Sequence, residues 1–209
     1  MHIEPGILSA MKVGAANTVA VAMLVPMAIH CTRKPWLLVR ACLAAGFFTL
    51  AMQIFHLKVG PSELHFVAAM PIYLTLGVVP TLLGFAGGLL LQGALFEPVD
   101  LVHLGVNTLS LAIPLLIVHF ALGARIQRLR LRDVLRLDGT YYAGLTLMVG
   151  FWLSLSDTLT PLSEWVRFAS SYLTVVVFEP FVTVAMLSVL GHLRGHPIVQ
   201  SCFDLHPAA

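Results

Sequence analysis

The sequence predicts an all-α membrane protein, a polytopic bundle of about seven transmembrane helices that forms one integral membrane domain over residues 1–209. Hydrophobic residues make up 58% of the chain and charged residues only 11%, which is about half the charged share of soluble domains. A helix needs about 20 apolar residues to cross a hydrocarbon core of roughly 30 Å. A chain of 209 residues therefore has room for about six or seven spans joined by short loops.

The apolar stretches follow one another along the whole chain. The third and fourth are short and meet at Val79-Pro80, where proline removes a backbone donor and disfavours helix at the residue before it. We expect two short helices there, or one broken hairpin that does not cross fully. The predicted spans are residues 7–29, 36–55, 65–79, 81–96, 101–124, 141–155 and 166–193.

Small residues predict where helices approach one another closely, because lipid tails give helices no hydrophobic reason to associate. The first span contains Gly14-Ala15-Ala16, and the fourth contains Gly84, Gly87 and Gly88. We expect helix contacts at both places.

Basic residues predict the orientation in a plasma (inner) membrane. Arg33 and Lys34 follow the first span, the Arg125–Arg136 segment separates the fifth from the sixth, and Arg194 follows the last. The positive-inside rule puts all of these in the cytoplasm. Seven spans then place the amino terminus outside, the carboxyl terminus in the cytoplasm, and His2 and His65 on the same outer side.

The Arg125–Arg136 segment also alternates arginine with leucine and valine. It is expected to be an amphipathic helix at the membrane surface or a docking surface for a partner subunit. The small net charge of +2 gives no support for nucleic-acid binding.

Several function classes lack their motifs. The sequence has no H-E-x-x-H zinc helix, no G-x-S-x-G nucleophile motif and no phosphate loop. Its three cysteines contain no Cys-x-x-Cys pair. The sequence thus predicts a transporter component and not an enzyme, with ATP hydrolysis expected in partner subunits and no organic cofactor. The first residues lack the pattern of a cleaved signal peptide, so we expect the native amino terminus to be retained.

The opening Met1-His2 can bind a metal. A free terminal amine, the amide nitrogen of residue 2 and Nδ1 of His2 close two fused chelate rings, and one more imidazole completes a square. Planar nitrogen coordination suits Ni²⁺ or Cu²⁺ and accommodates Co²⁺, whereas Zn²⁺ prefers a tetrahedron. A histidine at position 2 is usually a solvated residue, so the spacing alone leaves both readings open.

Three motifs in consistent order resemble the CbiM/NikM family, the substrate-binding membrane components (permeases) of energy-coupling-factor (ECF) ABC transporters for cobalt and nickel. They are the opening Met1-His2-Ile3-Glu4-Pro5-Gly6, the segment from Gly60 to Phe66 that contains His65, and Leu104-Gly105-Val106-Asn107. The resemblance implies an ECF S-component-like bundle with the N-terminal segment packed into it.

The resemblance also implies a site and partners. Carried over residue by residue, Met1, His2 and His65 bind Co²⁺ or Ni²⁺ as the transported substrate. The implied partners are an ECF transmembrane coupling subunit, ATPase subunits, a small accessory membrane protein and the lipid bilayer. The sequence departs from the family at Ser110, where members often have a second asparagine, and in the looser spacing between Ser62 and His65. Residues expected to orient a ligating histidine are Ser62, Glu63 and Asn107.

Three further residues leave alternatives open. His56 and His103 lie near the outer interface, where they either pass metal to the site or are merely solvated. Glu179 lies mid-span, where a charge costs about 2.5 to 3.5 kcal/mol on insertion scales. Glu179 is expected to be either a protonated or paired side chain inside the bundle, or the working group of a stand-alone metal or proton-coupled carrier.

Overall fold

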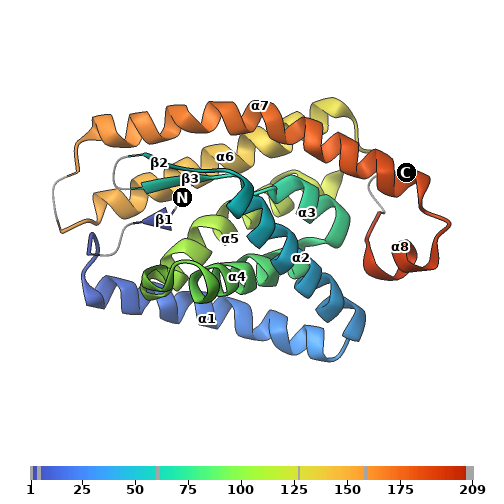
Figure 1. Ribbon diagram of the computed structural model, residues 1–209, viewed down its shortest axis with the longest axis horizontal. Coiled ribbons are helices and arrows are strands. Elements are labelled where there is room, and N and C mark those ends of the chain that lie inside the picture. The colour runs from blue at the N-terminus through green and yellow to red at the C-terminus, as the bar shows by residue number, and fades with distance from the viewer. Residues whose placement is uncertain (1, 4–5, 60–61, 127, 158–159, 206–209) are drawn as a thin grey trace.

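The computed structural model describes residues 2–3, 6–59, 62–126, 128–157 and 160–205, and it shows a helical bundle that encloses a small β-sheet (Figure 1). The helices are α1 (Ala10–Thr32), α2 (Pro35–Ile54), α3 (Ala69–Leu76), α4 (Val78–Leu95), α5 (Leu104–Ala121), α6 (Leu131–Ser154), α7 (Leu162–His192) and α8 (Pro197–Cys202). The strands are β1 (His2–Ile3), β2 (His56–Val59) and β3 (Ser62–His65), and the 3-10 helices are η1 (Pro98–His103) and η2 (Gly123–Arg125).

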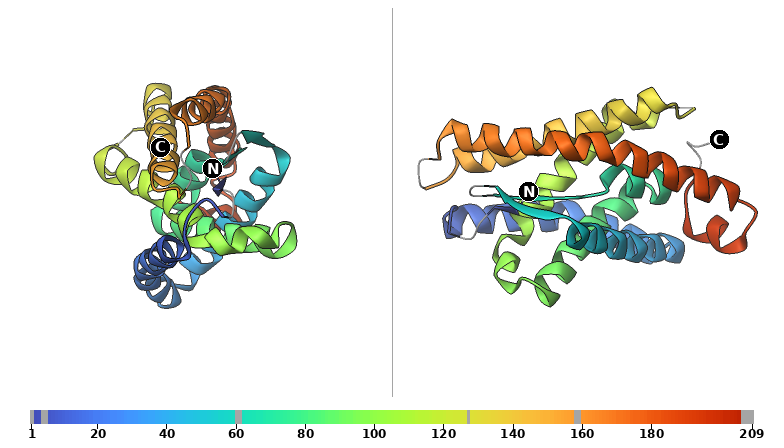
Figure 2. Two further views of the ribbon diagram at one scale, coloured as in Figure 1. Left: turned by 90° about the vertical axis from the view of Figure 1, so that its left-hand side faces the viewer. Right: turned by 45° about the horizontal axis from the view of Figure 1, so that its top comes forward.

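Two groups of helices enclose the centre. Helices α6 and α7 pack along one side, α1 lies along the other, and α4 and α5 lie between them (Figures 1 and 2). Every residue of α3 is buried, and most of the first half of α5 is buried as well. The sheet lies toward the end of the bundle where α1 begins, and α8 lies toward the other end (Figure 1).

Five helical segments of the described chain are long and apolar enough to cross a membrane. They are α1, α2, α4, α7 and the segment Pro98–Arg125 around α5. The protein is therefore a multi-pass membrane protein, but the predicted number of about seven spans is not reached by this measure. At 1.5 Å per residue, the eight residues of α3 extend for only about 12 Å, so the predicted span 65–79 does not cross a bilayer as a helix.

The break between α3 and α4 lies at Gly77, two residues before the predicted position. Gly77 has φ +91°, a left-handed conformation that costs glycine nothing. Pro80 instead lies in the first turn of α4, where its missing N–H has no helical partner to lose. The glycine ends one helix, and the proline is accommodated at the start of the next.

The expectation of an all-α fold was incomplete, because three strands form an antiparallel sheet in the order β1-β3-β2. His65 lies at the end of β3 and not at the start of a helix. The first strand comes from the amino terminus and pairs with a segment 60 residues away in sequence. Pairing at that separation leaves no local periodicity in the sequence.

Close helix packing occurs at the predicted glycines of α4 but not at Gly14. A β-carbon added at Gly84 would lie 2.3 Å from Ala44 Cβ of α2, and one at Gly88 would lie 2.4 Å from Phe48 Cδ1. A β-carbon at Gly14 would meet nothing within 4 Å. The glycines of α4 therefore allow the backbones of α2 and α4 to touch.

The sixth helix begins ten residues before the predicted span 141–155. Helix α6 starts at Leu131, and Asp133 accepts a hydrogen bond from the backbone of Arg130 at 3.0 Å. The Arg125–Arg136 segment is therefore divided between η2, an irregular connection and the first turns of a long helix, and it does not form a separate surface helix. A groove of about 540 Å³ between the start of α6 and the end of α7 is lined by Leu129, Arg130, Leu131, Val134, Val184, Leu187, Ser188, Gly191 and His192.

Candidate metal centre

The amino-terminal strand lies beside the strand that carries His65. In the antiparallel register, His2 is opposite Glu63 and Ile3 is opposite Ser62. The Cα atoms of antiparallel cross-strand partners lie about 4.5 to 5.5 Å apart. Glu63 is two residues from His65 along β3. Met1 lies outside the described residues, and His2 is described by its backbone. The fold thus brings residue 2 and residue 65 into one sheet.

Helix α5 holds the first strand in place through the backbone of Ile3. The Ile3 N–H donates to Asn107 Oδ1 at 3.3 Å, and the Ile3 carbonyl accepts from His103 Nδ1 at 2.9 Å. Both side chains are 1% exposed and Ile3 is 0% exposed. Because a carbonyl only accepts, His103 must carry its proton on Nδ1. The expected fold with a packed N-terminal segment therefore has a specific anchor.

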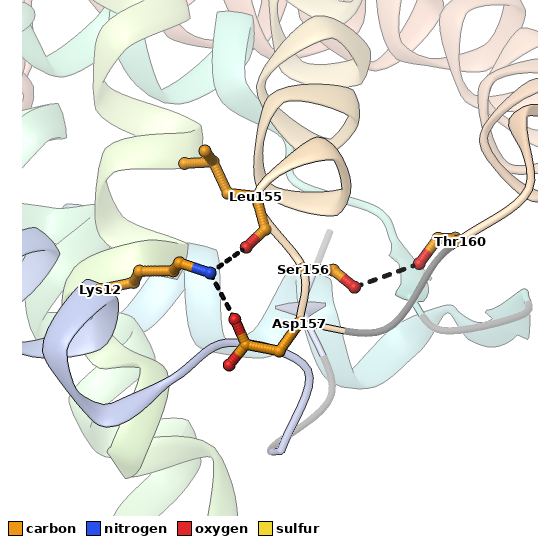
Figure 3. A network of polar contacts seen from close by, with 5 residues as sticks. All are labelled: Lys12, Leu155, Ser156, Asp157 and Thr160. Carbon is orange, nitrogen blue, oxygen red and sulfur yellow. Dashed lines mark hydrogen bonds and ion pairs between the residues drawn. The ribbon is translucent and has the colours of Figure 1, made fainter.

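The segment after β1 is anchored a second time, at the loop between α6 and α7 (Figure 3). Lys12 Nζ donates to the Leu155 carbonyl at 2.7 Å and forms an ion pair with the Asp157 carboxylate. The Asp157 N–H donates to the Ile7 carbonyl at 3.1 Å. These contacts fix where the amino-terminal segment leaves the sheet and enters α1.

His65 is buried and oriented by its neighbour. Its side chain is 4% exposed, and its Nε2 lies 3.1 Å from Glu63 Oε2. An ionised carboxylate only accepts hydrogen bonds, so Nε2 carries a proton, and in the neutral imidazole Nδ1 then carries the lone pair. A carboxylate that receives the N–H of a ligating imidazole is the usual arrangement around a metal-bound histidine. Of the three residues expected to orient a ligating histidine, Glu63 is the one that contacts the His65 ring.

The other predicted residues around the site have different surroundings. Asn107 contacts the backbone of residue 3 and not an imidazole. Ser62 is 0% exposed, and its hydroxyl finds no hydrogen-bond partner within the described ranges. Ser110, the departure from the family pattern, accepts a hydrogen bond from Trp152 Nε1 at 2.9 Å. At the position where family members often carry an asparagine amide, this chain therefore has a hydroxyl that accepts a hydrogen bond from a tryptophan.

The two interfacial histidines have distinct positions. His56 is exposed and opposite His65 in the register, with the two rings nearly parallel and their centroids 6.2 Å apart. His103, in contrast, is buried against Ile3 and positions the first strand. Sequence reasoning missed this role, although His103 and Asn107 are four residues apart and therefore share one helix face.

Carboxylates gather near the exposed side of the sheet. The pKa of Glu97 is raised, first by partial desolvation, then by the charge of Glu63 and by Asp100, while His56 lowers it. Such mutual effects require these charges to lie near one another. The edge of the site that carries His56 is therefore acidic.

The described residues alone do not complete a metal site. No group of three or more His, Cys, Asp or Glu side chains in the described ranges is arranged to hold a metal ion. A metal ion at His65 would therefore need further ligands, and the strands on the two sides of β3 are β1, from the amino-terminal segment, and β2.

Comparison with known proteins agrees with this fold. The fold is similar to the crystal structure of a transition metal transporter, with a TM-score of 0.72, 19% sequence identity, and coverage of 95% of this chain and 96% of that chain. No curated protein matches the sequence. A family model described as the cobalt uptake substrate-specific transmembrane region matches residues 2–197. Because this match covers nearly the whole chain, the protein belongs to the CbiM family of membrane components for cobalt uptake.

Proposed function

We propose that this chain is the substrate-capturing membrane component of an ECF-type transporter that takes up Co²⁺ or Ni²⁺. The ion is held by the amine of Met1, the amide nitrogen and imidazole of His2, and the imidazole of His65. The observation that supports the proposal is the pairing of His2 with Glu63, which is two residues from the buried His65 on the same strand.

The proposed donor set consists of four nitrogens. Three come from adjacent atoms of the first two residues and form fused chelate rings, so they bind as a preorganised unit. His65 supplies the fourth through the nitrogen that the Glu63 contact leaves with its lone pair. Four nitrogens in a plane suit Ni²⁺ and accommodate Co²⁺.

The acidic edge formed by Glu63, Glu97 and Asp100 supports capture from the outside. A cluster of carboxylates raises the local concentration of cations and the rate at which they reach the site, and salt screens this effect. Exposed His56 lies on the same edge, directly opposite His65 in the register. It gives an arriving ion a nitrogen contact before the buried site.

Release toward the cytoplasm needs energy from other chains, because the sequence has no phosphate loop. We infer that a transmembrane coupling subunit and ATPase subunits supply it, and that a small accessory membrane protein completes the assembly. The basic start of α6 is the surface we assign to the cytoplasmic face.

Isothermal titration of the detergent-purified chain with Ni²⁺ and with Co²⁺ tests the ligand set. His2→Ala, His65→Ala and a variant with one glycine added before Met1 should each weaken binding by more than about 100-fold, beyond the loss expected when a group around a ligand is changed. His56→Ala is the matched control for equilibrium affinity, because His56 pairs with His65 in the same sheet but is exposed, and a transient contact during entry changes the rate of binding and not the affinity of the final site. Unchanged affinity in the extended variant or in His2→Ala would refute the assignment.

The alternative is a stand-alone carrier that works through Glu179. Glu179 is 0% exposed, and its two oxygens already accept hydrogen bonds from Met70 and Tyr142, which favours a positioning role. Metal uptake by proteoliposomes that contain this chain alone would support the carrier. Uptake only after ATPase and coupling subunits are added would support the first proposal.

A further inference from the structure

Two carboxyl side chains that metal binding does not use meet in the middle of the bundle. Asp138 of α6 and Glu179 of α7 are both 0% exposed, and their carboxyl groups lie close enough to interact with each other. The titratable groups that face Glu179 are Asp138, Tyr141, Tyr142 and Tyr172, and α3 presents only backbone groups to it. No basic side chain appears among these neighbours.

Glu179 caps the start of α3. One oxygen accepts the Met70 N–H at 2.8 Å, and the carboxylate also accepts the Ala69 N–H. The Tyr142 hydroxyl donates to the other oxygen. The first N–H groups of a helix have no partner within the helix, and a carboxylate is a favourable acceptor for them. Glu179 therefore has enough donors around it to remain ionised in the interior.

Asp138 is in the opposite situation. Neither of its oxygens receives a hydrogen bond from a donor atom within the described ranges, and its neighbour is the Glu179 carboxylate. A buried charge without donors is very costly, and two adjacent carboxylates do not both ionise. One of the two carboxyl groups therefore carries a proton, and Asp138 is the group that has no donor to stabilise a charge within the described ranges.

The capped helix is joined directly to the strand that bears His65. Only Phe66, Val67 and Ala68 separate β3 from α3, and Ala68 has φ 52°. A left-handed conformation is unfavourable for alanine, so this turn has to be held by its surroundings. Glu179 holds the helix that follows Ala68. Seven residues earlier on the same helix, Tyr172 faces the backbone of His65.

We propose that Asp138 and Glu179 bind a single proton, located on Asp138, and that this pair positions His65 by fixing the turn between β3 and α3. The two carboxyls are positioning residues, and the effect on metal affinity rests on the function proposed above. The location of the proton does not depend on that function.

Infrared spectroscopy in D₂O tests the proton without any metal. The wild-type protein should show the carbonyl stretch of a protonated carboxylic acid, and Asp138→Asn should lose it, because the amide supplies a permanent N–H donor where the acid supplied O–H. A difference spectrum without this band would overturn the proposal, whatever the outcome of metal titration.

Titration with Ni²⁺ tests the positioning. Asp138→Asn should bind within about threefold of wild type because it keeps a donor toward Glu179. Glu179→Gln, which replaces the ionised cap of α3 by a neutral one, should bind about tenfold to 100-fold more weakly, as for other groups behind a ligand. Should that variant not fold, Tyr142→Phe takes its place, with a severalfold loss expected.

Thr183→Val is the matched control, because Thr183 is 0% exposed on the same helix and its hydroxyl bonds only to the helix backbone at 3.0 Å. It should bind as wild type does. Wild-type affinity in Glu179→Gln, or an equal loss in Thr183→Val, would overturn the positioning role. If wild type itself binds no metal, the function proposed above fails while the infrared result still stands.

Discussion

Asn107→Ala should weaken metal binding without touching a metal ligand. Asn107 accepts the N–H of Ile3 at 3.3 Å in a fully buried contact, and alanine leaves this N–H without a partner in the interior. An unsatisfied buried donor costs about 1 to 3 kcal/mol. If that cost falls on the docked state of β1, affinity for Ni²⁺ or Co²⁺ drops by roughly fivefold to 150-fold.

The chain offers a close control for this variant. Asn17 of α1 accepts the N–H of Gly105 through Oδ1 at 2.8 Å, so Asn17→Ala removes the same type of bond from the start of the same helix, α5. The hydrogen bond of Asn17 is made to α5 and not to β1. We expect Asn17→Ala to lower the melting temperature and leave the affinity near that of wild type, whereas Asn107→Ala should change the affinity.

Isothermal titration on both variants, with a native amino terminus and at one salt concentration, separates the two effects. A thermal unfolding curve in the same detergent reports the stability of each variant. Equal affinities of wild type and Asn107→Ala would refute the reasoning, because the anchor of β1 would then not matter to the site. Equal losses in both Asn variants would show that α5, and not the strand, is the sensitive element.

Three other changes have defined outcomes. The pKa of Glu97 is raised by desolvation and by neighbouring carboxylates, so its ionisation destabilises the fold as pH rises from the ordinary value of about 4.3 through the raised one. Glu97→Gln should therefore raise the melting temperature at neutral pH and leave it unchanged near pH 3, as thermal scans at the two pH values would show. Gly84→Val should cost about 1 to 3 kcal/mol or more, because its β-carbon would overlap the facing alanine of α2, whereas Gly14→Val should fold normally in the same denaturation assay. Asp157→Asn should cost less than about 1 kcal/mol, since the Lys12 and Asp157 side chains are 32% and 49% exposed, and a loss of melting temperature that persists in high salt would contradict the ion-pair explanation.

The helices could be predicted from the apolar stretches and the polar or proline-containing segments between them, because each helix is marked by its own local sequence. The predicted spans 7–29, 36–55 and 166–193 overlap α1, α2 and α7 along nearly their whole length. The prediction erred at Pro80, where a proline that the first turn tolerates was taken as the break, although Gly77 with its positive φ ends α3. Local chemistry thus identified the helices better than it identified their ends.

The sheet could not be predicted, because its pairing is between distant segments. Strands of two to four residues are too short to show alternation, and nothing local marks residues 2 and 63 as neighbours. Asp138 was missed for a related reason. The sixth span was predicted to begin at residue 141, which left Asp138 in a loop. Helix α6 instead begins at Leu131, and Asp138 lies on its buried face.

The proposed site is divided between two holding elements, and this suggests how it releases its ion. Asn107 of α5 and His103, directly before α5, hold the first strand, while α7 holds the turn after His65 through Glu179. Metal–nitrogen distances tolerate only about 0.2 Å, so a small shift of α5 relative to α7 would separate the chelating amino terminus from His65. A partner that moves α5 therefore has only to break the contacts of His103 and Asn107 with Ile3. The ion then loses its fourth ligand before any helix unfolds.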